Sequence, residues 1–245
     1  MSNNCGTTLD QIQHKFRTLL NINNIHSKSI ITSSVSTAIY LKSKMDIKTE
    51  KVFLIAQEPF RRTLEDHGIQ SFGMGPVEII KDVHDWEHFE VDSSVKYVIV
   101  TFDPYYNHTK LTEAYLYIKE NNAEYISPDC DDFCFSVSPT RKVPGPLSIH
   151  SGLSTILDMK PKIMGKPDPF LFELIQTVHG KLDQKKTIMI GDNYETDVKF
   201  GFNCGISTAL VLTGRAKPED VGGFKIKPNF VLTTLSDISQ NSDDL

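Results

Sequence analysis

Cysteine and long apolar runs are scarce in this sequence, and each scarcity excludes a class of protein. The 245 residues include four cysteines (Cys5, Cys130, Cys134 and Cys204), too few and too scattered for a disulfide scaffold. Cys130 and Cys134 lack the histidine or second cysteine pair that a zinc site needs. No stretch approaches the roughly 20 apolar residues that span a bilayer, and the polar start MSNNCGTTLD is not a signal peptide. We therefore expect a cytoplasmic protein with no membrane partner.

Positive charge is also in short supply. The chain carries 26 basic and 31 acidic residues, which gives a net charge of -5 and a pI near 5.9. This balance argues against a protein that binds nucleic acid by displacing counterions. Acidic substrates would have to be met by local positive charge. A chain of this length, 39% hydrophobic, can form one sizeable core or two smaller ones.

Short apolar runs rich in β-branched residues alternate with helical patterns along the chain. This alternation predicts an α/β protein with a mostly parallel sheet. The proline-, aspartate- and serine-rich segment 128–146 is expected to be mostly loop. The predicted strands are 51–57, 96–103, 123–127, 187–190, 208–212 and 229–233, and the predicted helices are 8–20, 34–41, 59–67, 108–121, 147–159 and 168–179.

Two carboxylates follow the apolar run 187–190. Gly191 allows a sharp turn at its end, Asp192 comes next, and Asp197 lies near the first turn of the following helix. Ligands of open α/β sheets bind beyond the carboxyl ends of the strands, and hard oxygen ligands there suit Mg²⁺. The alternative is that both residues only cap and solvate the helix start, and the spacing alone leaves the two interpretations equal.

Two further candidates lie far from this pair in the chain. Lys166, in MGKPDP, is presented at a helix entry where its ammonium could hold a phosphoryl oxygen. Ser2, Asn3 and Asn4 could offer a hydroxyl and backbone N–H groups to an anion. Taken singly, a solvated lysine and a frayed terminus are the simpler interpretations.

Together these motifs carry a family resemblance. The order SNN, then GKPDP, then GDNYETD followed by LVLTG resembles the haloacid dehalogenase-type phosphatases, within them the subfamily of p-nitrophenyl phosphatase, phosphoglycolate phosphatase and pyridoxal phosphate phosphatase. The resemblance implies a Rossmann-like core of residues 1–45 and 161–245 with a parallel sheet, and an inserted α/β cap of residues 46–160. A small phosphorylated metabolite is the implied substrate, and a homodimer formed through the cap is a further expectation.

The resemblance also implies chemistry. Members of this family hydrolyse phosphate monoesters with Mg²⁺ through an aspartyl-phosphate. Ser2, Asn3 and Asn4 match the residues that bind the phosphoryl group, and Lys166 matches the lysine that neutralises it and orients the nucleophile. Asp192 matches the metal ligand, and Asp197 matches the acid that holds the lysine or a metal-bound water. The cap loop Pro128-Asp129-Cys130-Asp131 resembles the family's Thr-Asn-x-Asp, which selects the substrate. Asp131 matches the acid of that motif, whereas its Asn is lost.

The family's first motif, Asp-x-Asp-Gly, should precede SNN, but SNN begins at residue 2. Asp103, Asp129 and Asp131 match the cap instead, and Asp103 is interpreted as structural. We expect that the core sheet lacks its first central strand, that the 245 residues alone have no phosphatase activity, and that an upstream segment encodes the motif. The alternative is a non-catalytic binding protein that uses the cap and the residual phosphate site. A phospho-accepting receiver domain is disfavoured, because there the lysine follows the acids.

Overall fold

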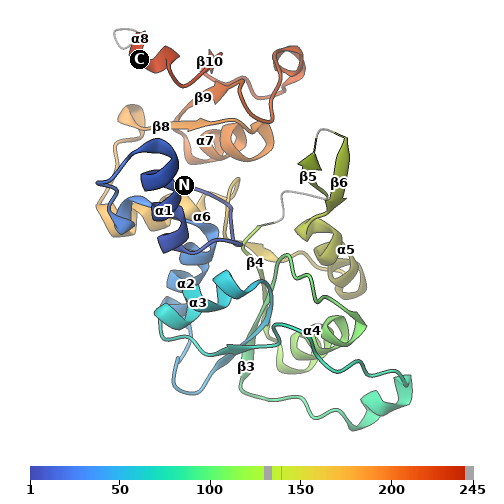
Figure 1. Ribbon diagram of the computed structural model, residues 1–245. Helices are drawn as coiled ribbons and strands as arrows, with labels where there is room; N and C mark the ends of the chain where they lie inside the picture. Colours follow the sequence, from blue (N-terminus) through green and yellow to red (C-terminus); the bar gives the residue numbers. More distant parts are fainter. Residues whose placement is uncertain (130–133, 139, 241–245) are drawn as a thin grey trace. The chain divides into compact units, whose positions relative to one another are not determined.

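The computed structural model describes residues 1–129, 134–138 and 140–240, and its contacts divide the chain into two compact units, Met1–Gly165 and Lys166–Leu245 (Figure 1). The α/β class is confirmed, because both larger sheets are parallel. The expected assignment of residues 1–45 and 161–245 to one core stays a prediction. Among the described helices, none combines the length and apolar character needed to cross a bilayer.

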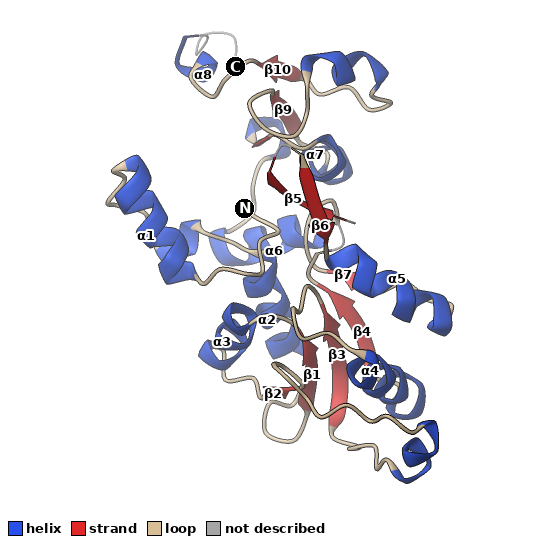
Figure 2. Cartoon of the chain, turned by 45° about the vertical axis from the view of Figure 1, so that its right-hand side comes forward, coloured by secondary structure: helices blue, strands red, loops and turns tan. Residues whose placement is uncertain are grey.

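The first unit is built around a five-stranded parallel sheet in the order β2-β1-β3-β4-β7. Figure 2 shows helices on both of its sides, and α4 and α5 pack on the face formed by Phe53, Val98 and Val100. These strands read as continuous apolar runs because both faces are covered. The strands are β1 (Lys51–Ile55), β2 (Ser71–Phe72), β3 (Val95–Val100), β4 (Glu124–Ser127) and β7 (Lys162–Ile163), and the helices are α1 (Leu9–Leu20), α2 (Ser33–Lys44), α3 (Glu58–Asp66), α4 (His108–Asn121) and α5 (Pro146–Leu157).

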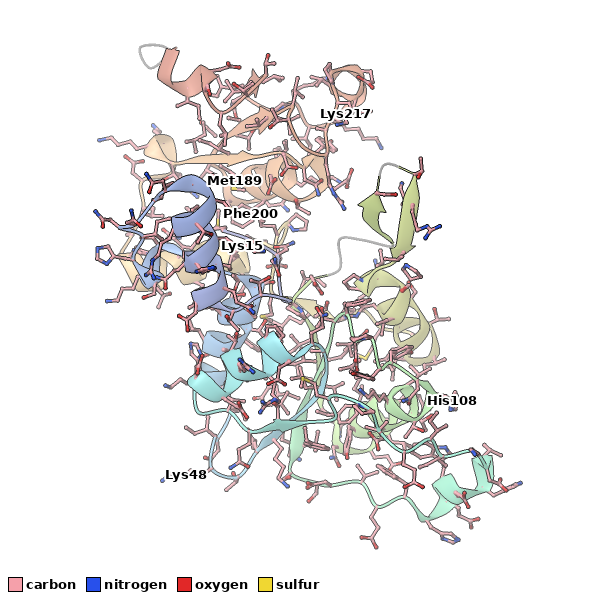
Figure 3. The ribbon with its side chains drawn as sticks, viewed as in Figure 1. Lys15, Lys48, His108, Met189, Phe200 and Lys217 are labelled. Atoms are coloured by element: carbon pink, nitrogen blue, oxygen red, sulfur yellow. The ribbon has the colours of Figure 1, made fainter. Side chains whose placement is uncertain are left out.

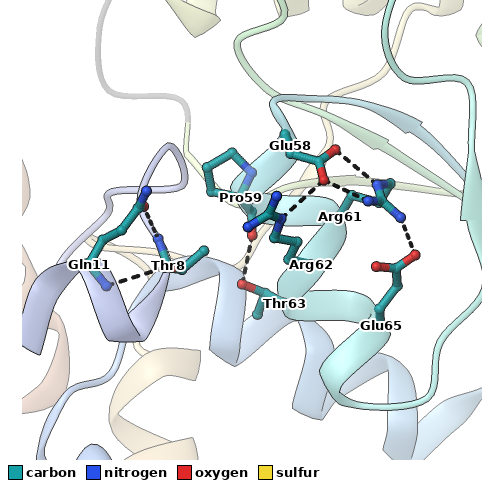
Figure 4. Close-up of polar contacts among 8 residues, drawn as sticks. All are labelled: Thr8, Gln11, Glu58, Pro59, Arg61, Arg62, Thr63 and Glu65. Atoms are coloured by element: carbon teal, nitrogen blue, oxygen red, sulfur yellow. Dashed lines mark hydrogen bonds and ion pairs between the residues drawn. The ribbon is translucent and has the colours of Figure 1, made fainter.

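Helix α1 begins at a capping box. The Thr8 hydroxyl accepts a hydrogen bond from the Gln11 N–H, and the Gln11 side chain accepts one from the Thr8 N–H (Figure 4). The helix ends at Asn21, which takes the left-handed conformation. In the same view, Arg61 on α3 bonds to Glu58 and Glu65 one turn away on either side.

The expectation that 128–146 is mostly loop was wrong for its second half. Strands β5 (Cys134–Ser138) and β6 (Arg141–Pro144) form an antiparallel hairpin, with Cys134 opposite Pro144 and Ser138 opposite Arg141. Proline and serine are poor strand signals, but when the two runs pair, each satisfies the other's backbone groups.

The second unit carries a three-stranded parallel sheet in the order β10-β9-β8. Met189 of β8 and Phe200 of α7 are both buried (Figure 3). Within the described residues β8 is an edge strand, and its Ile188 and Ile190 are 38% and 37% exposed. The elements are α6 (Phe170–His179), β8 (Ile188–Gly191), a π-helical turn (Tyr194–Val198), α7 (Lys199–Cys204), β9 (Ser207–Val211), β10 (Phe230–Leu232) and α8 (Asp237–Gln240).

Candidate active site

Lys166 and Asp197 form a nearly buried ion pair in the second unit. The Lys166 Nζ lies 2.5 Å from Asp197 Oδ1, and the two side chains are 10% and 6% exposed. Asp197 Oδ2 accepts a hydrogen bond of 3.0 Å from the Asn193 N–H. The carboxylate is therefore held by both of its oxygens, and both side chains keep a small exposed surface.

Local sequence explains why Asp197 can lie against the end of β8. A Cβ atom at position 191 would overlap the Asp197 carboxylate, so this position requires glycine. The π-helical turn Tyr194–Val198 carries Asp197, and such turns are frequent at functional sites. On the lysine side, Asn203 Nδ2 donates a 2.9 Å hydrogen bond to the Pro167 carbonyl, so α7 anchors the segment that presents Lys166.

Asp192 is fixed by the turn that follows β9. Its Oδ2 accepts a 3.0 Å hydrogen bond from the Arg215 N–H, and its carbonyl oxygen accepts one of 2.9 Å from Ala216. A Cβ at Gly214 would overlap the Asp192 carboxylate. No role was predicted for Gly214 or Arg215 from the sequence. Gly214 directly follows the apolar run 208–212 and Thr213, which was a usable signal for a turn at the end of a strand.

The carboxylate at this strand end is compatible with the few protein ligands that Mg²⁺ needs. Nowhere in the described residues do three histidine, cysteine or acidic side chains converge in a metal-binding group. Mg²⁺ usually takes only one or two carboxylates and completes its shell with water and substrate phosphate. The oriented Asp192 carboxylate is suited to that limited role, which stays a prediction.

Ser2, Asn3 and Asn4 belong to the first unit. Ser2 pairs with Thr32 in a parallel bridge, and its Oγ accepts a 3.2 Å hydrogen bond from the Asn4 N–H. Asn4 Oδ1 in turn accepts one of 2.9 Å from Gly6. The segment is therefore an ordered turn and not a frayed end. Because Lys166, Asp192 and Asp197 belong to the other unit, the convergence of all six residues stays a prediction.

The acids considered as substitute nucleophiles have other roles in the structure. Asp103 pairs with Lys110, with Nζ 2.5 Å from Oδ2 and both side chains fully buried, in keeping with its structural interpretation. Asp129 Oδ1 accepts a 2.6 Å hydrogen bond from Thr101 Oγ1. Asp131 lies outside the described residues. Sequence reasoning missed Lys110, although its place on the apolar stripe of 108–121 with Ala114 and Tyr117 was a signal.

Two family models match this chain. Residues 163–238 match a model described as HAD-hydrolase-like, and residues 1–70 match one described as haloacid dehalogenase-like hydrolase. The first range contains Lys166, Asp192 and Asp197, and the second contains the turn Ser2–Asn4. The predicted core motifs therefore fall inside the matched ranges, whereas the cap-loop residue Asp131 lies between them.

Several known proteins that are similar to this chain are named phosphatases. Phosphoglycolate phosphatase 2 of Arabidopsis thaliana is 30% identical, over 97% of this chain and 79% of that protein. Glycerol-3-phosphate phosphatase of Homo sapiens is 26% identical, over 86% of this chain and 69% of that protein. Among solved structures, a double mutant of the thermostable NPPase from Geobacillus stearothermophilus is 26% identical with a TM-score of 0.74, over 96% of this chain and 83% of that one.

Proposed function

This chain belongs to the haloacid dehalogenase-like hydrolases, and from that premise we propose that it binds a small phosphorylated metabolite for Mg²⁺-dependent hydrolysis of the phosphate monoester. The observation that supports this most is the Lys166–Asp197 pair, whose carboxylate lies against Gly191 at the carboxyl end of β8, with Asp192 next in the chain and its carboxylate fixed by the Arg215 N–H. Ligands of open α/β sheets bind at such strand ends.

Each residue of this group has a task in the proposed reaction. The Lys166 ammonium donates hydrogen bonds to the phosphoryl oxygens and offsets their charge. Asp197 holds that ammonium in place, so it is already oriented when the substrate arrives. Asp192 would hold Mg²⁺, which when bound supplies further charge compensation to the phosphoryl group. Ser2, Asn3 and Asn4 are proposed to offer their hydroxyl and backbone N–H groups to the same oxygens.

The attacking group is the part of the reaction that residues 1–245 do not supply. No Asp-x-Asp-Gly occurs in the sequence, so we propose that these residues alone bind the phosphoryl group without turning it over. An upstream segment carrying the motif would complete the reaction. The alternative is a non-catalytic protein that uses the residual phosphate site and the cap for binding.

Phosphate binding and turnover test the proposal separately. With Mg²⁺ and inorganic phosphate we expect the melting temperature to rise, because a ligand that binds only the folded state stabilises it. Lys166→Met and Asp192→Asn should abolish the rise, whereas Lys181→Met, at an exposed lysine, should preserve it. A flat response in the unsubstituted chain would contradict the proposed site.

Turnover of p-nitrophenyl phosphate with Mg²⁺ addresses the missing nucleophile. We expect no release of p-nitrophenol above the blank from residues 1–245. A version extended upstream by a strand ending in Asp-x-Asp-Gly should gain activity, and an Asp→Asn change in that motif should remove it. Turnover by the unextended chain would overturn the proposal that residues 1–245 bind phosphate without hydrolysing the ester. An inactive extended version that still binds phosphate would favour the non-catalytic alternative.

We also propose that residues 46–160 form the interface of a homodimer. The hairpin β5–β6 forms its own two-stranded sheet, and Arg141 and Lys142 on β6 are exposed. A lone hairpin gains stability when another element covers or extends it. Sedimentation over a range of concentrations is the test, and a monomer at every concentration would refute the dimer.

A further inference from the structure

His150 of α5 is a buried histidine outside the candidate active site, and both of its ring nitrogens have partners. Nδ1 lies 3.0 Å from the Tyr125 hydroxyl, and Nε2 lies 2.8 Å from Ser127 Oγ and 3.1 Å from the carbonyl oxygen of Asp129. The residue is only 2% exposed. A carbonyl oxygen can only accept, so Nε2 carries the hydrogen and the Tyr125 hydroxyl donates to Nδ1. These contacts select one neutral tautomer.

The contacts of His150 converge on the carboxyl end of β4. Ser127 is the last residue of that strand, and its hydroxyl also donates a hydrogen bond to the carbonyl oxygen of Asp129. The Asp129 carboxylate accepts a hydrogen bond from Thr101, which directly follows β3. His150 therefore joins α5 to the ends of two neighbouring parallel strands. In parallel sheets this edge is where ligands are bound.

The same stretch lies against the turn predicted to bind the phosphoryl group. A Cβ at Gly165 would stand 2.5 Å from the carbonyl oxygen of Pro128 and 2.7 Å from Oδ1 of Asn3. The Pro128 backbone and the Asn3 side chain thus both lie close to Gly165. A shift of the stretch Ser127–Asp129 would change the surface beside Asn3.

We propose that His150 is a positioning residue, which fixes the stretch Ser127–Asp129 and thereby sets the shape of the surface that receives the alcohol part of a phosphate ester beside Asn3. The proposal rests on the proposed function for its substrate, but the positioning itself can be tested without turnover. The hydrogen-bond partners of His150 are Tyr125, Ser127 and Asp129, none of which has a role in the proposed phosphoryl or metal site, so its expected effect is on selection and not on chemistry.

Three substitutions separate positioning from simple filling of space. His150→Gln keeps an amide donor near the Nε2 position and so can still bond to the Asp129 carbonyl. His150→Asn reaches only the Nδ1 position, near Tyr125. His150→Leu fills the space without any polar contact. Circular dichroism and thermal melting first establish that each variant is folded.

The first measurement is amide hydrogen exchange over residues 125–129, with residues 188–191 of β8 as an internal reference. We expect His150→Leu and His150→Asn to raise exchange at 125–129 by about five- to tenfold and His150→Gln to restore protection, with the reference unchanged. Equal exchange in the Gln and Leu variants, or an equal rise at 188–191, would overturn the positioning role.

The second measurement compares binding of inorganic phosphate and of p-nitrophenyl phosphate, by competition at low temperature. Positioning predicts that His150→Leu changes the ratio of the two dissociation constants at least about threefold, that His150→Gln restores it, and that phosphate binding itself is unchanged. An unchanged ratio would refute the selection role. If the unsubstituted chain binds neither probe, the proposed function fails, and the exchange measurement still decides whether His150 positions the stretch.

Discussion

Among the residues that the structure describes, two buried lysine–aspartate pairs occur, one in each unit, and they differ in solvent exposure. In both, Nζ and the carboxylate oxygen are 2.5 Å apart. Lys110 and Asp103 have no exposed side-chain surface, whereas Lys166 and Asp197 keep 10% and 6%. The two pairs therefore have the same Nζ–oxygen distance but differ in solvent exposure. The sealed pair is confined to a structural role, whereas the accessible pair keeps the exposed surface that the proposed contact with a ligand requires.

The neighbours of the two pairs support the same distinction. Asp103 also accepts a 2.8 Å hydrogen bond from the Tyr105 N–H, which holds the loop from β3 to α4. Asp197 depends on the glycine at position 191 and on a π-helical turn, both of which bring its carboxylate to a strand end. The Lys110–Asp103 pair stabilises a loop and requires neither a glycine nor a π-helical turn at a strand end.

Breaking the sealed pair should have the largest effect on stability. Lys110→Met leaves the Asp103 carboxylate buried without its counter-charge, and we expect a loss of about 3–5 kcal/mol in the free energy of unfolding. Urea denaturation is the measurement. The double variant Lys110→Met with Asp103→Leu should recover part of the loss, since no buried charge is then left alone. A loss below about 1 kcal/mol for the single variant would show that the pair is not sealed.

His150 sharpens the comparison because it is buried against hydroxyls and a carbonyl and not against a carboxylate. Burial lowers the pKa of His150 to about 4, with the hydrogen bond to the Asp129 carbonyl opposing the shift. As pH falls from 6.5 toward 4, the unfolded state takes up the proton first, so stability that is complete above pH 6.5 is progressively lost.

The expected loss is on the order of 3 kcal/mol, because the pKa of His150 falls to about 4 in the folded state. His150→Gln removes the titrating group while the carboxylates stay the same. Between pH 7 and pH 4 the unsubstituted chain should therefore lose more unfolding free energy than this variant does. A pH-independent difference would mean that the imidazole is not held neutral.

Breaking the accessible pair should have a smaller effect on stability and a larger one on binding. We expect Lys166→Met to lower the free energy of unfolding by about 1–2 kcal/mol, because the Asp197 carboxylate keeps the Asn193 N–H and gains access to water. Stabilisation by inorganic phosphate with Mg²⁺ should disappear. A stability loss equal to that of Lys110→Met would erase the distinction between the two pairs.

An exposed pair gives the lower limit of the series. Arg61 lies 2.6 Å from Glu58, and its hydrogen bond is the main cause that lowers the pKa of Glu58 to about 2. Stability from this pair is present above pH 4.5 and lost as pH falls toward 2. Solvent screening makes it small, so Glu58→Gln should change the free energy of unfolding by less than about 1 kcal/mol. A larger change would mean that the pair is less solvated than its surface position indicates.

Local signals predicted most of the elements. The apolar run KVFLI is β1, the pattern 108–121 is α4 to the residue, and the runs before and after GDNYETD are β8 and β9. The hairpin β5–β6 was missed, because its stability comes from pairing between two runs whose composition is typical of loops. Composition reports the preference of a residue, whereas strand pairing depends on a partner elsewhere in the chain.

The sequence by itself determined the family, the α/β class and the motif residues, because these depend on residue type, order and short-range periodicity. Only the tertiary structure decided which ionisable groups are sealed. The apolar stripe of 108–121 indicates that Lys110 is buried, but the sequence alone does not pair it with Asp103 or join His150 to the end of β4. Burial and hydrogen-bond geometry arise when distant segments pack together, and they decide whether a charge stabilises a loop or receives a substrate.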